Sequence, residues 1–206
     1  MTLRDAVPDD LGAIMALERA SFPTDAWSDA MMREELSSPH GWYIVDEEGP
    51  QLLGYAGLRA PRGSKDADVQ TIAIAEAARG QGRGRVILSA LLHEAARRRV
   101  REVFLEVRAD NPVAQGLYAS EGFVELGRRP HYYQPDDIDA VIMRLVVADW
   151  VAARERTSEP GPTSEIGRNA EHPAGIAPTS GGSPAFGERR RASADAASPA
   201  STEVPE

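Results

Sequence analysis

The chain has 206 residues, a net charge of −9 and no cysteine. This length suits one well-buried domain, and the lack of cysteine excludes disulfides, thiolate catalysis and cysteine-based metal sites. The acidic balance, the four scattered histidines and the absence of an N-terminal leader or long apolar run predict a cytoplasmic protein that binds no nucleic acid, metal or membrane.

The first part of the chain predicts an opening strand, two helices and three further strands. Apolar residues recur at helical spacing after Pro8, and Ser28 is placed to cap the second helix. The strands show β-branched or alternating apolar residues between turn residues. They are predicted over residues 2–6, 42–46, 51–59 and 68–75.

Residues 78–85, A-R-G-Q-G-R-G-R, place a glycine cluster directly before an apolar helix. A glycine-rich turn at a helix N-terminus favours anions, because free N–H groups and the helix dipole both point toward the ligand. The P-loop needs a lysine that is absent here, and the glycine spacing does not fit the dinucleotide fingerprint. The cluster fits R-x-x-G-x-G, read as Arg79, Gly82 and Gly84. That pattern alone leaves an anion site and a turn without a ligand both open.

The second part of the chain predicts a helix, a strand, a short helix and two more strands. The first helix has an apolar stripe that includes Ile87 and Leu91, and the elements after it are predicted over residues 103–109, 111–120, 122–126 and 139–147. Antiparallel strands therefore come first and a β-α-β unit second. This order predicts a mixed α/β (α+β) sheet of about seven strands.

Three polar residues in this part are candidates for chemistry. Glu106 lies on the strand face opposite Leu105 and Val107, where it is either a charge on a wet face or a general base. Asn111 suits the N-cap of the next helix, which explains it without a ligand. Tyr118 follows two turns later on the same side and is either a packed aromatic or a general acid.

The end of the chain differs in composition from the rest. Residues 155–206 are rich in Pro, Gly and Ser and contain few large apolar side chains. Such a segment buries too little apolar surface to offset its chain entropy. We therefore expect one folded domain over residues 1–154 and a disordered tail over residues 155–206.

Several motifs resemble one family. The R-x-x-G-x-G loop, after a strand ending T-I-A-I, is similar to the acetyl-CoA pyrophosphate loop of the GNAT N-acetyltransferases. L-E-V-R-A-D-N-P-V-A-Q-G-L-Y-A-S-E-G-F, residues 105–123, matches the signature of their RimI-type ribosomal-protein-alanine N-acetyltransferases. R-R-P-H-Y-Y, D-A-V-I-M and S-F-P-T-D-A-W-S also resemble this family, the last with residues 24–26 inserted. The resemblance covers residues 1 to about 148.

The resemblance implies a fold, a co-substrate and a set of site residues. The fold is the GNAT fold, a mostly antiparallel sheet with helices on both faces and a central strand pair that splays at a bulge. The co-substrate is acetyl-CoA, without a metal. Glu106 is the implied base, Tyr118 the implied acid and the Ile74 N–H the implied oxyanion donor. The residues implied to bind acetyl-CoA are Ile72, Ala73, Ile74, Gly80, Gln81, Gly82, Arg83, Gly84, Arg85 and Asn111.

The implied reaction is acetyl transfer to the N-terminal α-amine of a protein, with the N-terminal alanine of a small-subunit ribosomal protein as acceptor. The amine attacks directly, since a chain without cysteine lacks the usual thiol nucleophile. The alternatives are a GNAT enzyme for lysine side chains or small-molecule amines, a non-catalytic acetyl-CoA-binding module, and a protein dominated by partner binding through its tail. The insertion at residues 24–26 leaves the acceptor preference open. Acidic residues near it would attract a cationic peptide N-terminus: Asp25, Asp29, Glu34 and Glu35.

Overall fold

A computed structural model describes residues 1–158, and the structural statements below concern this part of the chain. Helices and strands alternate irregularly along it. In chain order they are β1 (Thr2–Asp5), α1 (Leu11–Ser21), α2 (Asp29–Ser37), β2 (Gly41–Glu48), β3 (Gln51–Arg59), β4 (Asp66–Ile74), α3 (Arg83–Arg97), β5 (Glu102–Arg108), α4 (Pro112–Ser120), β6 (Val124–Tyr133), β7 (Ile138–Val146) and α5 (Val147–Ser158). Short 3-10 turns precede α1 and α3, at Pro8–Asp10 and Glu76–Ala78.

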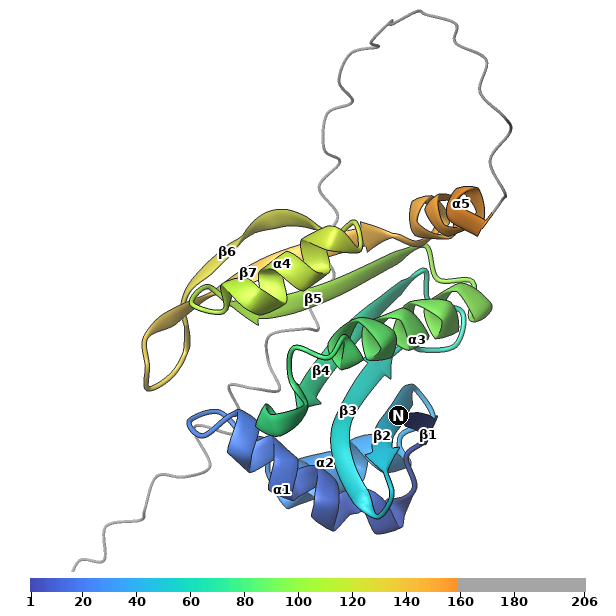
Figure 1. The fold of residues 1–206 in the computed structure, drawn as a ribbon. Helices are drawn as coiled ribbons and strands as arrows, with labels where there is room; N and C mark the ends of the chain where they lie inside the picture. The colour runs from blue at the N-terminus through green and yellow to red at the C-terminus, as the bar shows by residue number, and fades with distance from the viewer. Residues whose placement is uncertain (159–206) are drawn as a thin grey trace, which may run out of the picture.

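The seven strands form one sheet in the order β1-β2-β3-β4-β5-β7-β6 (Figure 1). Neighbouring strands run antiparallel, except that β4 and β5 run parallel at the centre. The predicted mixed, mostly antiparallel sheet of about seven strands is therefore confirmed. The central parallel pair is the one that α3 connects, as expected for a crossover connection.

Each face of the sheet has its own helices and its own core. α3, α4 and α5 contribute to the larger core, together with Leu58 of β3 and Leu105 of β5. α1 and α2 pack on the other face over β2, β3 and β4, around a core that includes Tyr55. Ser28 caps α2 as predicted, with its hydroxyl accepting from the Met31 N–H at 3.2 Å.

A bulge in β4 changes which face its side chains occupy. The pairing of β3 with β4 shifts register between Gly57 and Leu58, which leaves Gln70 as the extra residue. One extra residue moves every later side chain to the opposite face. Accordingly, Val69 belongs to the core under α3, whereas Ala73 belongs to the core under α1 and α2.

Beyond this bulge the two central strands separate. β4 and β5 are paired from Asp66 to Asp68 on β4, opposite residues 102–104 of β5. Figure 1 shows them side by side at this end and apart at their C-terminal ends. The splayed strand pair implied by the family resemblance is therefore present.

Two elements differ from the sequence-based expectation. β6 continues past residue 126 to Tyr133, because an edge strand tolerates Pro130 and the register irregularities around it. The helix α5 was not predicted. It extends four residues past the expected domain end at 154, and Trp150 anchors it through an Nε1–H donated to Glu121 at 3.0 Å. The rest of the predicted tail, residues 159–206, lies outside the described residues. Within residues 1–158, no helix has the length and apolar character needed to cross a membrane.

Candidate active site

The separation of β4 from β5 leaves a cleft with two adjoining sections. The loop section has a volume of about 550 Å³ and lies against the glycine-rich loop before α3. The strand section, of about 90 Å³, lies between β4 and β5. Both sections are lined by the same five residues: Phe22, Ile72, Asn111, Ala114 and Tyr118.

Glycines shape the wall of the loop section in two different ways. Gly80 and Gly82 have φ angles of 73° and 78°, and a Cβ at either position would meet nothing within 4 Å. Their backbone conformation, rather than crowding, therefore requires glycine. Gly84 lies inside α3, where a Cβ would contact the Leu117 side chain at 3.4 Å. Its small size lets α3 and α4 approach closely.

The N-terminus of α3 faces the loop section. Its N-cap is Gly82, which has no side chain to bond the N–H groups of the first turn. The backbone from Gly82 to Arg85 lines the loop section. Unpaired N–H groups at a helix N-terminus bind anions, so this wall fits a pyrophosphate.

The arginines of this loop are held by carboxylates. Arg83 is 7% exposed and forms ion pairs with Asp46, at 2.9 Å, and with Glu48. Arg85 pairs with Glu121 at 2.6 Å. The expectation that the side chains of Arg83 and Arg85 add net positive charge to the loop is therefore corrected. Both residues remain in the lining, and Arg83 ties α3 to β2.

Backbone groups of β4 point into the cleft. The Ala75 N–H donates to the Leu53 carbonyl of β3 at 2.8 Å. Hydrogen-bonded pairs alternate along an antiparallel ladder, so Ala73 also bonds to β3, whereas Ile72 and Ile74 direct their N–H and C=O groups away from it. That side is the one β5 has left. The Ile74 carbonyl there accepts a hydrogen bond from Arg79 Nε at 3.1 Å.

The strand section brings Glu106 and Tyr118 together as lining residues. The Glu106 side chain is 4% exposed, and its Oε1 lies 2.7 Å from Arg129 Nη1 on β6. It is therefore not a charge on a wet sheet face. Tyr118, on α4, is buried and lies beside Phe123, with ring centroids 5.8 Å apart.

Asn111 has a structural role that the sequence already suggested. Its Oδ1 accepts from the Ala114 N–H at 3.0 Å and caps α4. The same residue lines both sections of the cleft. The cap holds the first turn of α4 against the cleft, so capping and ligand contact are compatible.

Asp68 is a second carboxylate near Glu106 that the sequence did not single out. It is the last residue of β4 paired with β5, and it projects on the same face as Glu106 because both lie opposite the face of Val69 and Leu105. Burial raises the pKa of Asp68 to about 7. Arg59 opposes this shift, and the negative charges of Asp66 and Glu106 add to it.

Sequence reasoning also missed side chains that line the strand section from distant segments. Phe22 and Asp25 lie between α1 and α2, Arg108 ends β5, and Tyr133 ends β6. Each of them falls inside one of the family-like motifs. The motifs carried that signal, but only the folded chain shows that these residues share one cleft.

Known proteins resemble the chain in sequence and in structure. Residues 11–123 match the family model described as the acetyltransferase (GNAT) family. The N-alpha-acetyltransferase RimI of Mycobacterium tuberculosis is 42% identical over 124 residues, which cover 58% of this chain and 75% of that protein. The putative [ribosomal protein bS18]-alanine N-acetyltransferase of Bacillus subtilis is 32% identical over 147 residues, covering 71% and 92% of the two chains.

A crystal structure shares the fold. The ribosomal-protein-alanine N-acetyltransferase from Escherichia coli superposes with a TM-score of 0.65 at 28% identity, over 71% of this chain and 93% of that one. The family match, the sequence relatives and this shared fold agree with the split sheet and the glycine-rich loop. The chain belongs to the GNAT family and is an N-acetyltransferase.

Proposed function

We propose that this chain transfers the acetyl group of acetyl-CoA to the N-terminal α-amine of a protein, with the N-terminal alanine of a small-subunit ribosomal protein as acceptor. One observation carries the proposal. Glu106 from β5 and Tyr118 from α4 line one cleft, which opens where β4 leaves β5. The name of the Bacillus subtilis relative, which specifies bS18 alanine, supports the acceptor.

The loop section suits acetyl-CoA. When bound, acetyl-CoA supplies an activated acetyl thioester and a thiol leaving group. The backbone of residues 80–85, at the N-terminus of α3, would hold the pyrophosphate. Ile72, Ala73 and Ile74 would hold the pantetheine arm, because they line the loop section and two of them direct backbone groups into it.

Glu106 is the proposed general base. An α-amine has a pKa near 8, so at neutral pH most acceptor molecules carry an extra proton and cannot attack. The Glu106 carboxylate takes that proton, directly or through a water. Its ion pair with Arg129 fixes the position of the carboxylate against the sheet. The amine nitrogen then forms the new C–N bond with its freed lone pair.

Ile74 and Tyr118 act on the other side of the reacting carbonyl. The Ile74 N–H donates to the thioester oxygen as it gains negative charge, which is typically worth about 3–4 kcal/mol of the barrier. The Tyr118 hydroxyl donates its proton to the sulfur as the C–S bond breaks. Tyr118 then regains a proton from solvent, and Glu106 releases the one it took.

Peptide substrates test the acceptor class. The wild-type enzyme and acetyl-CoA are mixed with an alanine-initiated peptide, with the same peptide blocked at its N-terminus but carrying a lysine, and with a polyamine. Mass spectrometry should find the acetyl group on the free α-amine alone. Acetylation of the blocked peptide or the polyamine, at a rate equal to that of the free peptide, would place the enzyme with lysine or small-molecule acetyltransferases.

Tyr118→Phe tests the proposed acid. The phenylalanine ring keeps the packing against Phe123 and removes only the hydroxyl. Turnover should fall by about 10²-fold while the Kd for acetyl-CoA, measured by calorimetry, stays within twofold. Unchanged turnover would remove Tyr118 from the mechanism.

A further inference from the structure

The loop between α1 and α2 is fixed at both ends. The Glu18 carboxylate is fully buried and accepts from the Trp27 N–H at 3.0 Å and from the Tyr55 hydroxyl. Ser28 then caps α2. The anchored ends leave residues 23–26, which include the inserted segment, to project from the α1 and α2 layer.

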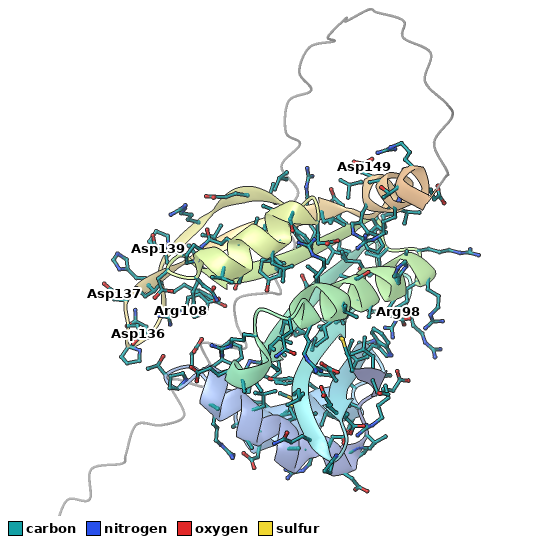
Figure 2. All side chains as sticks on the ribbon, viewed as in Figure 1. Arg98, Arg108, Asp136, Asp137, Asp139 and Asp149 are labelled. Atoms are coloured by element: carbon teal, nitrogen blue, oxygen red, sulfur yellow. The ribbon has the colours of Figure 1, made fainter. Side chains whose placement is uncertain are left out.

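The projecting segment is tied to the opposite side of the cleft. Thr24 Oγ1 donates to Asp136 Oδ2 at 2.8 Å, although the two residues are 112 positions apart. Asp136 lies in the turn between β6 and β7 and also pairs with Arg108 at 2.9 Å. Figure 2 shows Arg108 and Asp136 near each other at this end of the molecule. The α1–α2 loop is thus fastened across the mouth of the strand section.

This connection places the Asp25 carboxylate among the lining of the strand section, with Glu106 and Arg108. Glu106 is paired with Arg129, and Arg108 is paired with Asp110 and Asp136. These ion pairs offset the charges of Glu106 and Arg108. Asp25 adds a negative charge to the wall that an acceptor passes on its way to Glu106.

We propose that Asp25 is a specificity-determining residue, which favours acceptors with a cationic side chain within their first three residues. The inference rests on the proposed function and names the acceptor class of the same site. An acceptor whose amine reaches Glu106 extends outward by about 3.5 Å per residue, so its next side chains pass the lining of the strand section. Opposite charges near a partly buried wall attract, and a like charge there is disfavoured. The Thr24–Asp136 hydrogen bond holds Asp25 in this position.

Matched peptides test the inference. Three alanine-initiated peptides differ only in having arginine, glutamine or glutamate as second residue. The wild-type enzyme should prefer arginine over glutamine by about three- to fivefold in kcat/KM, the size expected for one partly exposed ion pair, and should use the glutamate peptide least. In Asp25→Asn this ratio should fall to about one. The change should lie in KM, with kcat for the glutamine peptide unchanged.

Two further variants separate position from general charge. Thr24→Val keeps the shape of the side chain and removes the donor to Asp136, and it should reduce the ratio as well. Asp29→Asn removes a nearby exposed carboxylate that pairs with Arg19, and it should leave the ratio as in the wild type. A ratio that persists in Asp25→Asn, or falls equally in Asp29→Asn, overturns the inference. A wild-type enzyme that acetylates none of the three peptides overturns the proposed function, and the inference with it.

Discussion

The two sections of the cleft are built in opposite ways. The loop section is largely made of backbone from one stretch of chain, residues 72–85, backed by α4. The strand section is made of side chains from the α1–α2 loop, β4, β5, α4 and β6. The comparison teaches that the donor end depends on local conformation, whereas the acceptor end depends on how distant segments meet. Substitutions should therefore affect one end and spare the other.

Glu106→Gln should produce the largest separation between the two ends. The amide keeps the size of the side chain but cannot take a proton, so kcat/KM should fall by about 10²- to 10⁴-fold. Calorimetry should show an unchanged Kd for acetyl-CoA, because Glu106 lines the strand section. Glu102→Gln is the matched control, since Glu102 lies on the same face of β5 and pairs with Arg144 at 2.8 Å. Its activity should stay within twofold of the wild type, and equal losses in both variants would point to folding rather than chemistry.

Asp68→Asn tests the point at which β4 and β5 separate. The pKa of Asp68 is raised from 3.8 to about 7, so the folded chain holds a proton that the unfolded chain releases in this range. Wild-type stability should therefore decrease as pH rises from about 4 to 7, and Asp68→Asn removes that loss. Denaturant unfolding at pH 8 should show the variant more stable by on the order of 2 kcal/mol, with the difference vanishing near pH 4. A gain that is the same at both pH values would contradict the assigned pKa.

Gly82→Ala should show a smaller effect, confined to the donor end. An alanine at φ 78° costs about 1 kcal/mol or somewhat more, and relaxing this strain would move the N–H groups of the loop. Acetyl-CoA affinity should decrease about fivefold, as measured by calorimetry. Gly63→Ala provides the comparison, because Gly63 has φ 77° and equally open surroundings in the β3–β4 turn. It should lower stability similarly and leave acetyl-CoA affinity intact; weakened binding in both variants would argue against a specific role of the loop.

The same contrast explains what could be predicted from the sequence. Most strands and helices followed from periodicity and caps, such as Ser28 and Asn111, because these signals act between neighbours in the chain. The glycine-rich loop was recognisable for the same reason. The split of the sheet came from family resemblance, since nothing in the local pattern of β4 states where β5 leaves it.

Contacts between distant residues could not be predicted in this way. The ion pair between Arg83 and Asp46 joins residues 37 positions apart, so the sequence suggested a ligand-facing charge where the fold uses a structural one. The helix α5 depends on Trp150 reaching Glu121, a partner on another element. The Thr24–Asp136 hydrogen bond closes the acceptor end through residues whose local sequence gives no sign of it.

A crystal structure with a bisubstrate ligand, CoA joined through an acetyl linker to the N-terminus of an alanine-initiated peptide, tests the account most directly. The account predicts the pyrophosphate against the backbone of residues 80–85, the linker between Glu106 and Tyr118, and the peptide leaving past Asp25. A linker bound away from Glu106 and Tyr118, or a peptide leaving by another route, would contradict it.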